Sequence, residues 1–377
     1  MAQDIIHMKP QILIVENSID VTGALNAILG SSSLLRNNLD FVFILPSGSK
    51  GKKLVEAKDF KVYELPLKEI RKNIFSILLY FPFLLFNVLK LKRIMVKEGI
   101  DLVVSNDFYN LLPPLSRFLG NPIPYVCFVR FMPIRFPGVL VRLWLNVHLK
   151  FSNKIIAVSK AVKKELPPHD KIMFLYEGID CSTAVDLNRE SKTILYLANY
   201  IRGKGQEYAL KSFAGIYKSF PDWKLRFVGG DMGLKKNSEF KGKLQAMSKE
   251  LGCNEQVEFI GFSENILMEF RNAALALNFS DSESFSFTCL EAMQAGLPVV
   301  ATKCGGPEEI ITSGIDGELV EIKNQEQMND VLKKLLSDSA QRKRYGEQAR
   351  KSVNEKFNVI NTATNLMSIY SEALKSN

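Results

Sequence analysis

ALALNFSDSESFSFTCLEAMQAGLPVVAT, residues 274–302, contains in order an apolar run, a polar loop, a helical pattern and a second apolar run. The runs ALALNF and PVVAT are typical of buried strands. The helix between them ends at Gly296, and Pro298 opens the second strand. Two such strands joined by a helix are a building unit of α/β folds with a parallel sheet.

Similar apolar runs recur along the chain, separated by stretches of helical length. They begin at residues 11, 41, 101, 124 and 154, and again at residues 193, 224, 257, 274 and 298. Strands that are apolar throughout are buried on both faces of a parallel sheet. We therefore predict an α/β protein with two doubly wound, Rossmann-like domains, linked by the polar stretch at residues 178–192.

The composition is that of a globular protein with two ordinary domains. The chain has 377 residues, 46% of them hydrophobic, and its mean hydropathy is zero. Its five cysteines are scattered and form no C-x-x-C pair, which argues against a disulfide framework or a zinc site. Lys9 and Pro10 interrupt the N-terminal apolar residues, so no secretory segment is expected. We predict a cytoplasmic protein without a metal site.

The net charge of +9 belongs almost entirely to the first half. Residues 1–190 contain 25 Lys and Arg against 17 Asp and Glu, which leaves 24 against 23 for the remainder. A surplus confined to one half indicates a negatively charged partner for that half.

Two carboxylates flank the beginning of the predicted helix. Glu283 lies in the loop at the carboxyl end of the first strand, and Glu291 lies within the helix. Ligands of doubly wound sheets bind at this edge, and the helix N-terminus between the two acids suits a phosphate. The arrangement matches a nucleotide sugar, whose diphosphate lies between two hydroxyl-rich rings. Solvated surface acids are the alternative interpretation.

The segment ESFSFTCLEAMQAGLPVVATKCGGPEEII, residues 283–311, resembles the E-x7-E signature of the family 4 glycosyltransferases. LANYIRGKGQEYALKSF, LRFVGGD and VEFIGF follow the order of segments in that family. The resemblance implies the GT-B fold, in which two Rossmann-like domains face each other across a cleft. It also implies an acceptor-binding domain at residues 1–182 and a nucleotide-sugar-binding domain at residues 183–377, with the C-terminal helix returning to the first domain.

The resemblance also implies roles for individual residues. Glu291 should hold the ribose hydroxyls of the donor, Glu283 the sugar ring, and Lys204 should neutralise the diphosphate. The other donor contacts that it implies are the backbone of Phe285, Ser286 and Phe287, the residues Gly261 and Phe262 at the base, and Gly23 in the first half.

Some positions depart from the family's pattern. Asn199 stands where the family has an arginine, and we expect the nearby Arg202 to supply the missing cation. Ser286 replaces a glycine. Arg130 occupies the position of a histidine near the transferred sugar. The chain's own histidines do not fit that position; they are His7, His148 and His169.

The leading hypothesis is a retaining glycosyltransferase that moves a sugar from a nucleotide diphosphate donor to a glycan or lipid-linked acceptor, in polysaccharide or glycoconjugate biosynthesis. A UDP-sugar is the preferred donor, and no other cofactor is expected. Cations and N–H dipoles would stabilise the departing diphosphate, so we expect catalytic roles for Glu283, Lys204 and Arg202, with Glu283 not acting as a nucleophile.

Two other functions remain open. One is a non-catalytic protein of the same fold that binds sugar nucleotides, and another is a nucleotide-sugar epimerase. Nucleic-acid binding is not expected, because the basic residues are dispersed and no nucleic-acid module is recognisable.

Residues 71–97 form the most apolar stretch of the chain. Pro82 and Asn87 interrupt it, and it falls short of the roughly 20 apolar residues of a membrane span. A buried pair of helices and a membrane-facing surface are both compatible with it. Together with the basic first half, it suggests a lipid-linked acceptor and a peripheral position on an anionic, cytoplasmic membrane face, with Arg130 and Arg135 contacting the acceptor phosphate.

Overall fold

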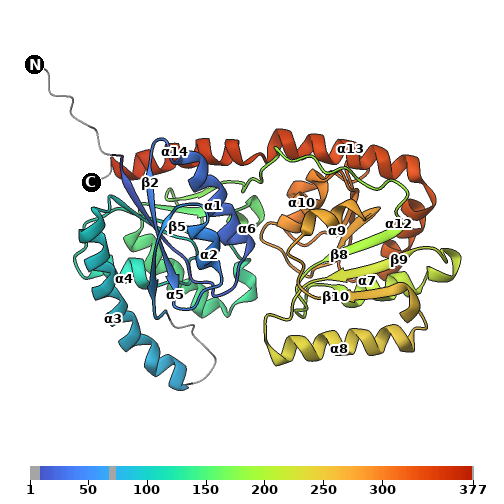
Figure 1. The fold of residues 1–377 in the computed structure, drawn as a ribbon. Helices are drawn as coiled ribbons and strands as arrows, with labels where there is room; N and C mark the ends of the chain where they lie inside the picture. Colours follow the sequence, from blue (N-terminus) through green and yellow to red (C-terminus); the bar gives the residue numbers. More distant parts are fainter. Residues whose placement is uncertain (1–8, 68–73, 376–377) are drawn as a thin grey trace, which may run out of the picture. The chain divides into compact units, whose positions relative to one another are not determined.

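The computed structural model describes residues 9–67 and 74–375, and the side chains of these residues except those of 74–81. The chain divides into two compact units. The first comprises Met1–Gly178 and Val359–Asn377, and the second comprises Ile179–Asn358 (Figure 1). The boundary expected after residue 182 lies a few residues beyond this division, and the C-terminal helix is part of the first unit.

Seven parallel strands form the sheet of the first unit, in the order β3-β2-β1-β4-β5-β6-β7. The strands are β1 (Gln11–Val15), β2 (Asp40–Pro46), β3 (Lys61–Leu65), β4 (Leu102–Ser105), β5 (Tyr125–Val129), β6 (Lys154–Ala157) and β7 (Ile172–Phe174). The five strands predicted in this half are confirmed. The edge strands β3 and β7 are additional, since β3 is partly exposed and lacks a continuous apolar run.

The helices of the first unit pack on the two faces of this sheet. They are α1 (Gly23–Leu35), α2 (Gly51–Glu56), α3 (Ile74–Glu98), α4 (Leu112–Phe118), the 3-10 turn η1 (Pro133–Arg135), α5 (Gly138–Phe151), α6 (Lys160–Lys164) and α14 (Val359–Leu374). α1 packs against α14, and α4 packs against both α3 and α5 (Figure 1). The crossover through α1 leads toward the β3 edge of the sheet, whereas the crossovers through α3, α4 and α5 lead toward the β7 edge. Because such crossovers are right-handed, α1 lies on one face of the sheet and α3, α4 and α5 lie on the other.

Helix α3 shows how the apolar stretch at residues 71–97 folds. It is a single helix that contains Pro82, so the expectation of a buried pair of helices is wrong; residues 71–73 lie outside the described residues. Pro82 removes one backbone donor from the helix, and buried side chains that follow the proline anchor the helix to the core. The anchoring residues among the described side chains include Leu84, Val88 and Leu91.

A search of the described helices finds none that is long and apolar enough to cross a membrane.

Six parallel strands form the sheet of the second unit, in the order β10-β9-β8-β11-β12-β13. They are β8 (Thr193–Leu197), β9 (Lys224–Val228), β10 (Val257–Ile260), β11 (Leu275–Asn278), β12 (Val299–Thr302) and β13 (Glu318–Val320). The five strands predicted here are also confirmed, and the short edge strand β13 is additional. The central strands β8 and β11 contribute buried side chains to the core, among them Tyr196, Leu275 and Leu277.

The helices of the second unit flank this sheet. They are α7 (Gln206–Ala214), η2 (Tyr217–Ser219), α8 (Lys235–Glu250), η3 (Asn254–Gln256), α9 (Ile266–Arg271), α10 (Phe287–Gln294), α11 (Pro307–Ile310), α12 (Gln325–Ser337) and α13 (Ser339–Lys356). α10 packs against α13, β11 and β12, which fixes the helix that follows β11 at the carboxyl edge of the sheet.

Candidate active site

The loop between β11 and α10 is shaped by hydrogen bonds within its own sequence. Ser286 is the N-cap of α10, and its Oγ accepts from the backbone N–H of Cys289 at 3.4 Å. Asn278, the last residue of β11, donates from Nδ2 to Ser286 Oγ at 2.9 Å and to Thr288 Oγ1 at 3.2 Å. The serine that replaces the family's glycine therefore holds the beginning of the helix. Neighbouring Phe285 is buried, and Phe287 begins the helix.

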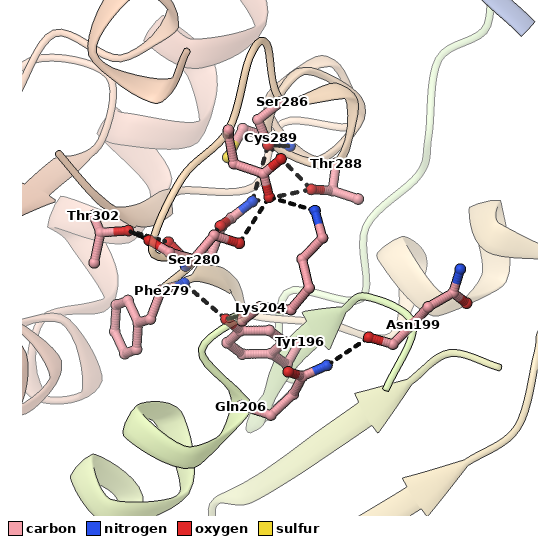
Figure 2. A network of polar contacts seen from close by, with 12 residues as sticks. Tyr196, Asn199, Lys204, Gln206, Phe279, Ser280, Ser286, Thr288, Cys289 and Thr302 are labelled. Carbon is pink, nitrogen blue, oxygen red and sulfur yellow. Dashed lines mark hydrogen bonds and ion pairs between the residues drawn. The ribbon is translucent and has the colours of Figure 1, made fainter. Parts of the chain in front are cut away.

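Lys204 and Glu283 meet at this edge of the sheet. Lys204 Nζ lies 2.8 Å from Glu283 Oε1, which also accepts from Ser280 Oγ at 2.7 Å (Figure 2). The side chains of Lys204 and Glu283 are 35% and 14% exposed, so a ligand can reach the lysine more easily. Desolvation by burial disfavours the ammonium, but the Glu283 carboxylate outweighs it and raises the pKa of Lys204. Lys204 is therefore protonated at neutral pH.

The turn that carries Lys204 is braced against the loop after β11. Gly205 has φ +79°, and a Cβ there would lie 1.9 Å from the Phe279 carbonyl oxygen. Tyr196 donates from its hydroxyl to the Lys204 carbonyl and accepts from the Phe279 N–H at 2.8 Å (Figure 2). A glycine and a buried tyrosine thus hold the Lys204 backbone in place.

The loop that carries Glu283 is clamped from the other side by the turn after β12. Glu283 N donates to the Cys304 carbonyl at 3.0 Å, and Gly306 N donates to the Glu283 carbonyl at 2.8 Å. A Cβ at Gly306 would lie 2.5 Å from the Phe285 Cα, so only glycine allows this close approach. The pair of glycines at 305 and 306 thereby fixes the Glu283 backbone.

Glu291 lies in α10, where it is only partly exposed. Burial raises the pKa of Glu291 to about 7. Within the described residues its carboxylate takes part in no hydrogen bond and no ion pair, so both oxygens are available to a ligand.

The expected donor residues Asn199 and Arg202 do not approach the Lys204–Glu283 pair with their side chains in this structure. Asn199 Oδ1 accepts a hydrogen bond from the Gly230 N–H at 2.9 Å. This bond links the segments that follow β8 and β9. The Arg202 guanidinium is exposed and lies over the Phe240 ring, with its carbon 5.6 Å from the ring centroid. The role of Arg202 at the diphosphate stays a prediction.

The expected base contacts lie after β10. Gly261 accepts from the Gly229 N–H at 3.2 Å through its carbonyl, and the Phe262 side chain is 69% exposed. An aromatic ring that faces solvent is available for stacking.

In the first unit, Gly23 is the first residue of α1, and the preceding Thr22 accepts from the Leu25 N–H at 3.2 Å. Thr22 therefore serves as the helix N-cap. Arg135 ends η1 and is exposed.

Arg130 does not have the environment expected of an acceptor contact. Its side chain is buried, forms an ion pair with Glu177 and lies over the Phe128 ring. Desolvation lowers the pKa of Arg130 to about 10, so the guanidinium remains charged at neutral pH. The structure shows this guanidinium paired with Glu177, and its contact with an acceptor phosphate stays a prediction.

Two carboxylates near Arg130 were not anticipated from the sequence. Glu16 and Asp107 follow β1 and β4, and Glu16 accepts from the backbone N–H groups of Asn17 and Ser18 at 2.8 Å each. Desolvation, with a smaller contribution from Glu16, raises the pKa of Asp107 to about 7. Their positions directly after two neighbouring buried strands were the available signal.

Comparison with known proteins shows which family this chain resembles. The family model "Glycosyltransferase Family 4" matches residues 33–183, and "Glycosyl transferases group 1" matches residues 182–352. N-acetyl-alpha-D-glucosaminyl L-malate synthase of Bacillus anthracis is 26% identical over 338 residues, which cover 84% of this chain and 86% of that protein. D-inositol 3-phosphate glycosyltransferase of Corynebacterium urealyticum is 30% identical over 191 residues, which cover 50% of this chain and 44% of that protein.

A solved structure shares the whole fold. Anabaena Alr3699/HepE in complex with UDP-glucose superimposes with a TM-score of 0.83 at 19% identity, covering 96% of this chain and 99% of that one. The predicted α/β GT-B fold with two Rossmann-like sheets is thereby confirmed. The two family models and the named relatives support glycosyl transfer in the synthesis of glycoconjugates. Because the two models follow one another along residues 33–352, this chain belongs to the family 4 glycosyltransferases.

Proposed function

We propose that this protein is a retaining hexosyltransferase that uses a UDP-sugar as donor and a glycan or lipid-linked molecule as acceptor. The observation that carries the proposal is the 2.8 Å ion pair of Lys204 and Glu283. Lys204 lies in the turn between β8 and α7, and Glu283 lies in the loop between β11 and the N-terminus of α10. A cation, a carboxylate and a helix N-terminus in one place are suited to a sugar attached to a diphosphate.

Each group has a distinct role in the proposed reaction. Lys204 and the N–H groups at the start of α10 stabilise the negative charge that grows on the leaving UDP. The Glu283 carboxylate accepts a hydrogen bond from a hydroxyl of the donor sugar. Its negative charge also stabilises the positive charge that develops on the sugar ring in the transition state. Because Glu283 Oε1 is already bonded to Lys204 and Ser280, we assign it this electrostatic role and not that of a nucleophile. Glu291 accepts the ribose hydroxyls.

The choice of donor and stereochemistry rests on resemblance. Anabaena HepE has been solved with UDP and with UDP-glucose, which favours UDP as the nucleotide. Retention of the anomeric configuration is the behaviour implied by the E-x7-E signature at Glu283 and Glu291. Exposed Phe262 is suited to stack on the base, and the first unit, which lacks these groups, is assigned the acceptor.

The alternatives have less support. The named relatives are synthases and glycosyltransferases, and none is an epimerase or a non-catalytic binding protein. His148 is buried and bonded to Tyr125 and the Phe108 carbonyl, and burial lowers its pKa to about 4, so it is not placed to serve as an epimerase acid or base.

The test is transfer by the purified protein. UDP-sugars are supplied with candidate acceptors, UDP release is measured, and the anomeric configuration of the product is determined by NMR. Lys204→Met should lower kcat about 100- to 1,000-fold because a fixed cation at the leaving group is lost. Lys192→Met is the matched control, since Lys192 forms a 2.7 Å ion pair with Asp222 and both residues precede the strands β8 and β9 at the other end of the sheet. Its rate should match that of the wild type.

Three results would count against the proposal. Equal loss in both lysine variants would indicate a general effect of charge. An inverted product would rule out retention. Nucleotide binding without transfer or hydrolysis of any UDP-sugar would instead favour a non-catalytic binding protein.

A further inference from the structure

Most of the exposed large apolar side chains described in the first unit lie on one layer of helices. α3, α4 and α5 share one face of the sheet, and α4 packs against the other two. We call the exposed side chains of residues 85–96, 118–119 and 134–150 the α3–α5 surface. Its principal apolar members are Leu85, Phe86, Leu89, Phe118, Val139 and Leu143.

On α3 these residues follow helical spacing. Phe86, Leu89, Arg93 and Val96 recur at intervals of three or four residues and form one exposed stripe. Leu89 is 58% exposed and Val96 is 85% exposed. The opposite side of the helix is buried, so α3 has apolar residues on both its core face and its outer face. A stripe of this kind is unusual on a helix that contacts only water.

α5 repeats the arrangement. Val139 is 79% exposed and Leu143 is 54% exposed, whereas Trp144 and His148 on the inner side are buried. The Phe151 ring at the end of α5 contacts the ring of Phe118 at the end of α4, with centroids 5.9 Å apart. The apolar groups therefore continue from α4 to α5.

The charge of the surface has one sign. The three ranges that define this surface contain six Lys or Arg and no Asp or Glu. At its edge, the Ile134 N–H donates to Glu165 Oε2 at 2.8 Å. Arg93 on α3 and Arg142 on α5 are exposed beside the apolar stripes. Apolar side chains among a majority of basic ones complement a surface that is negatively charged at the headgroups and apolar below them.

From this charge and exposure we infer that the α3–α5 surface docks onto a bilayer that contains anionic lipid. The leucines, phenylalanines and valines enter the headgroup region, while Arg93 and Arg142 pair with lipid phosphates. This inference goes beyond sugar transfer and does not depend on the Lys204–Glu283 site. If the protein both transfers sugar and docks on the bilayer, the α3–α5 surface would bring it to a lipid-linked acceptor.

Vesicle flotation of the full-length chain tests the inference. Binding is measured on phosphatidylcholine vesicles with and without phosphatidylglycerol, at low and high salt. The wild type should float with the anionic vesicles, and less so at high salt because screening weakens the attraction. Arg93→Gln with Arg142→Gln should weaken binding about 25-fold, at about fivefold for each charge lost. Leu89→Ser with Leu143→Ser should weaken it at least as much. Lys92 is left unchanged because its Nζ donates to the Leu119 carbonyl.

Matched variants in the second unit serve as controls. Lys236→Gln with Lys249→Gln removes two exposed charges from α8, and Leu251→Ser with Leu267→Ser removes two exposed leucines. All four variants should bind UDP as the wild type does. Absence of flotation at low salt, or equal losses in the control pairs, would overturn the inference. So would a dimer in lipid-free solution that the surface variants dissociate, since the surface would then be an interface between copies.

Discussion

The Glu291 carboxylate is partly buried in α10, receives no hydrogen bond from the described residues and has a pKa raised to about 7 by desolvation. Below that pH it is largely a neutral acid, and above it is a carboxylate able to accept two ribose hydroxyls. Affinity for uridine, which lacks a titrating phosphate, should therefore rise between about pH 6 and 8. Glu291→Gln should bind more weakly, by about 1.5 to 3 kcal/mol for each charge-assisted bond lost, without this pH dependence. Calorimetric titration at several pH values measures both effects.

The same variant provides a stability control. An acid whose folded pKa lies above its unfolded value of 4.5 destabilises the native state as pH rises from about 4.5 to 7. Glu291→Gln removes that term, so its Tm should exceed that of the wild type at about pH 8. Weak uridine binding with a lowered Tm would indicate misfolding, and pH-independent binding by the wild type would contradict the ribose assignment.

At the scale of elements, the loops at the carboxyl edge of the second sheet depend on glycines that admit another backbone. Gly306→Ala would place a methyl group 2.5 Å from the Phe285 Cα and displace the loop that carries Glu283. We expect a loss of about 1 to 3 kcal/mol of stability, together with weaker donor binding. Gly242→Ala is the matched control, because Gly242 lies inside α8 with nothing within 4 Å of its added Cβ. The Gly242→Ala substitution should raise the free energy of unfolding by up to about 1 kcal/mol. Denaturant unfolding and UDP titration measure the pair, and similar behaviour of the two would refute the close-approach argument.

At the scale of the whole molecule, each unit has its own sheet and core, and the last segment of the chain completes the first. α14 packs on α1, with Leu366 and Ile369 buried and Thr362 donating to the Tyr176 carbonyl at 3.0 Å. Leu366→Ala should destabilise the first unit by about 2 to 5 kcal/mol without changing UDP affinity. Leu332→Ala, in the core of the second unit, should reduce UDP affinity near its own unfolding transition. Calorimetry with and without UDP distinguishes them; loss of UDP binding at low temperature in Leu366→Ala would contradict this separation.

Local sequence was sufficient to predict much of this protein. The ten apolar runs predicted ten strands, and Gly296 and Pro298 correctly marked the end of α10 and the approach to β12. Burial on both faces demands continuous apolar residues, and turns demand glycine or proline, so these features can be read over a few neighbouring residues. The edge strand β3 escaped because exposed Lys61 and Glu64 interrupt its apolar residues, and β7 and β13 escaped because each has only three residues.

Contacts between distant residues were decided by the tertiary structure. Both members of the Lys204–Glu283 pair were predicted as site residues, but their 2.8 Å contact exists because β8 and β11 are neighbours in the sheet. The ion pair of buried Arg130 with Glu177 was not predicted, and it forms because the segments after β5 and β7 meet. Sequence alone thus determined which segments form strands and helices, because burial and turn chemistry are local. Only the tertiary structure decided which charges are paired and which remain available, because charge pairing depends on the order of strands in the sheet.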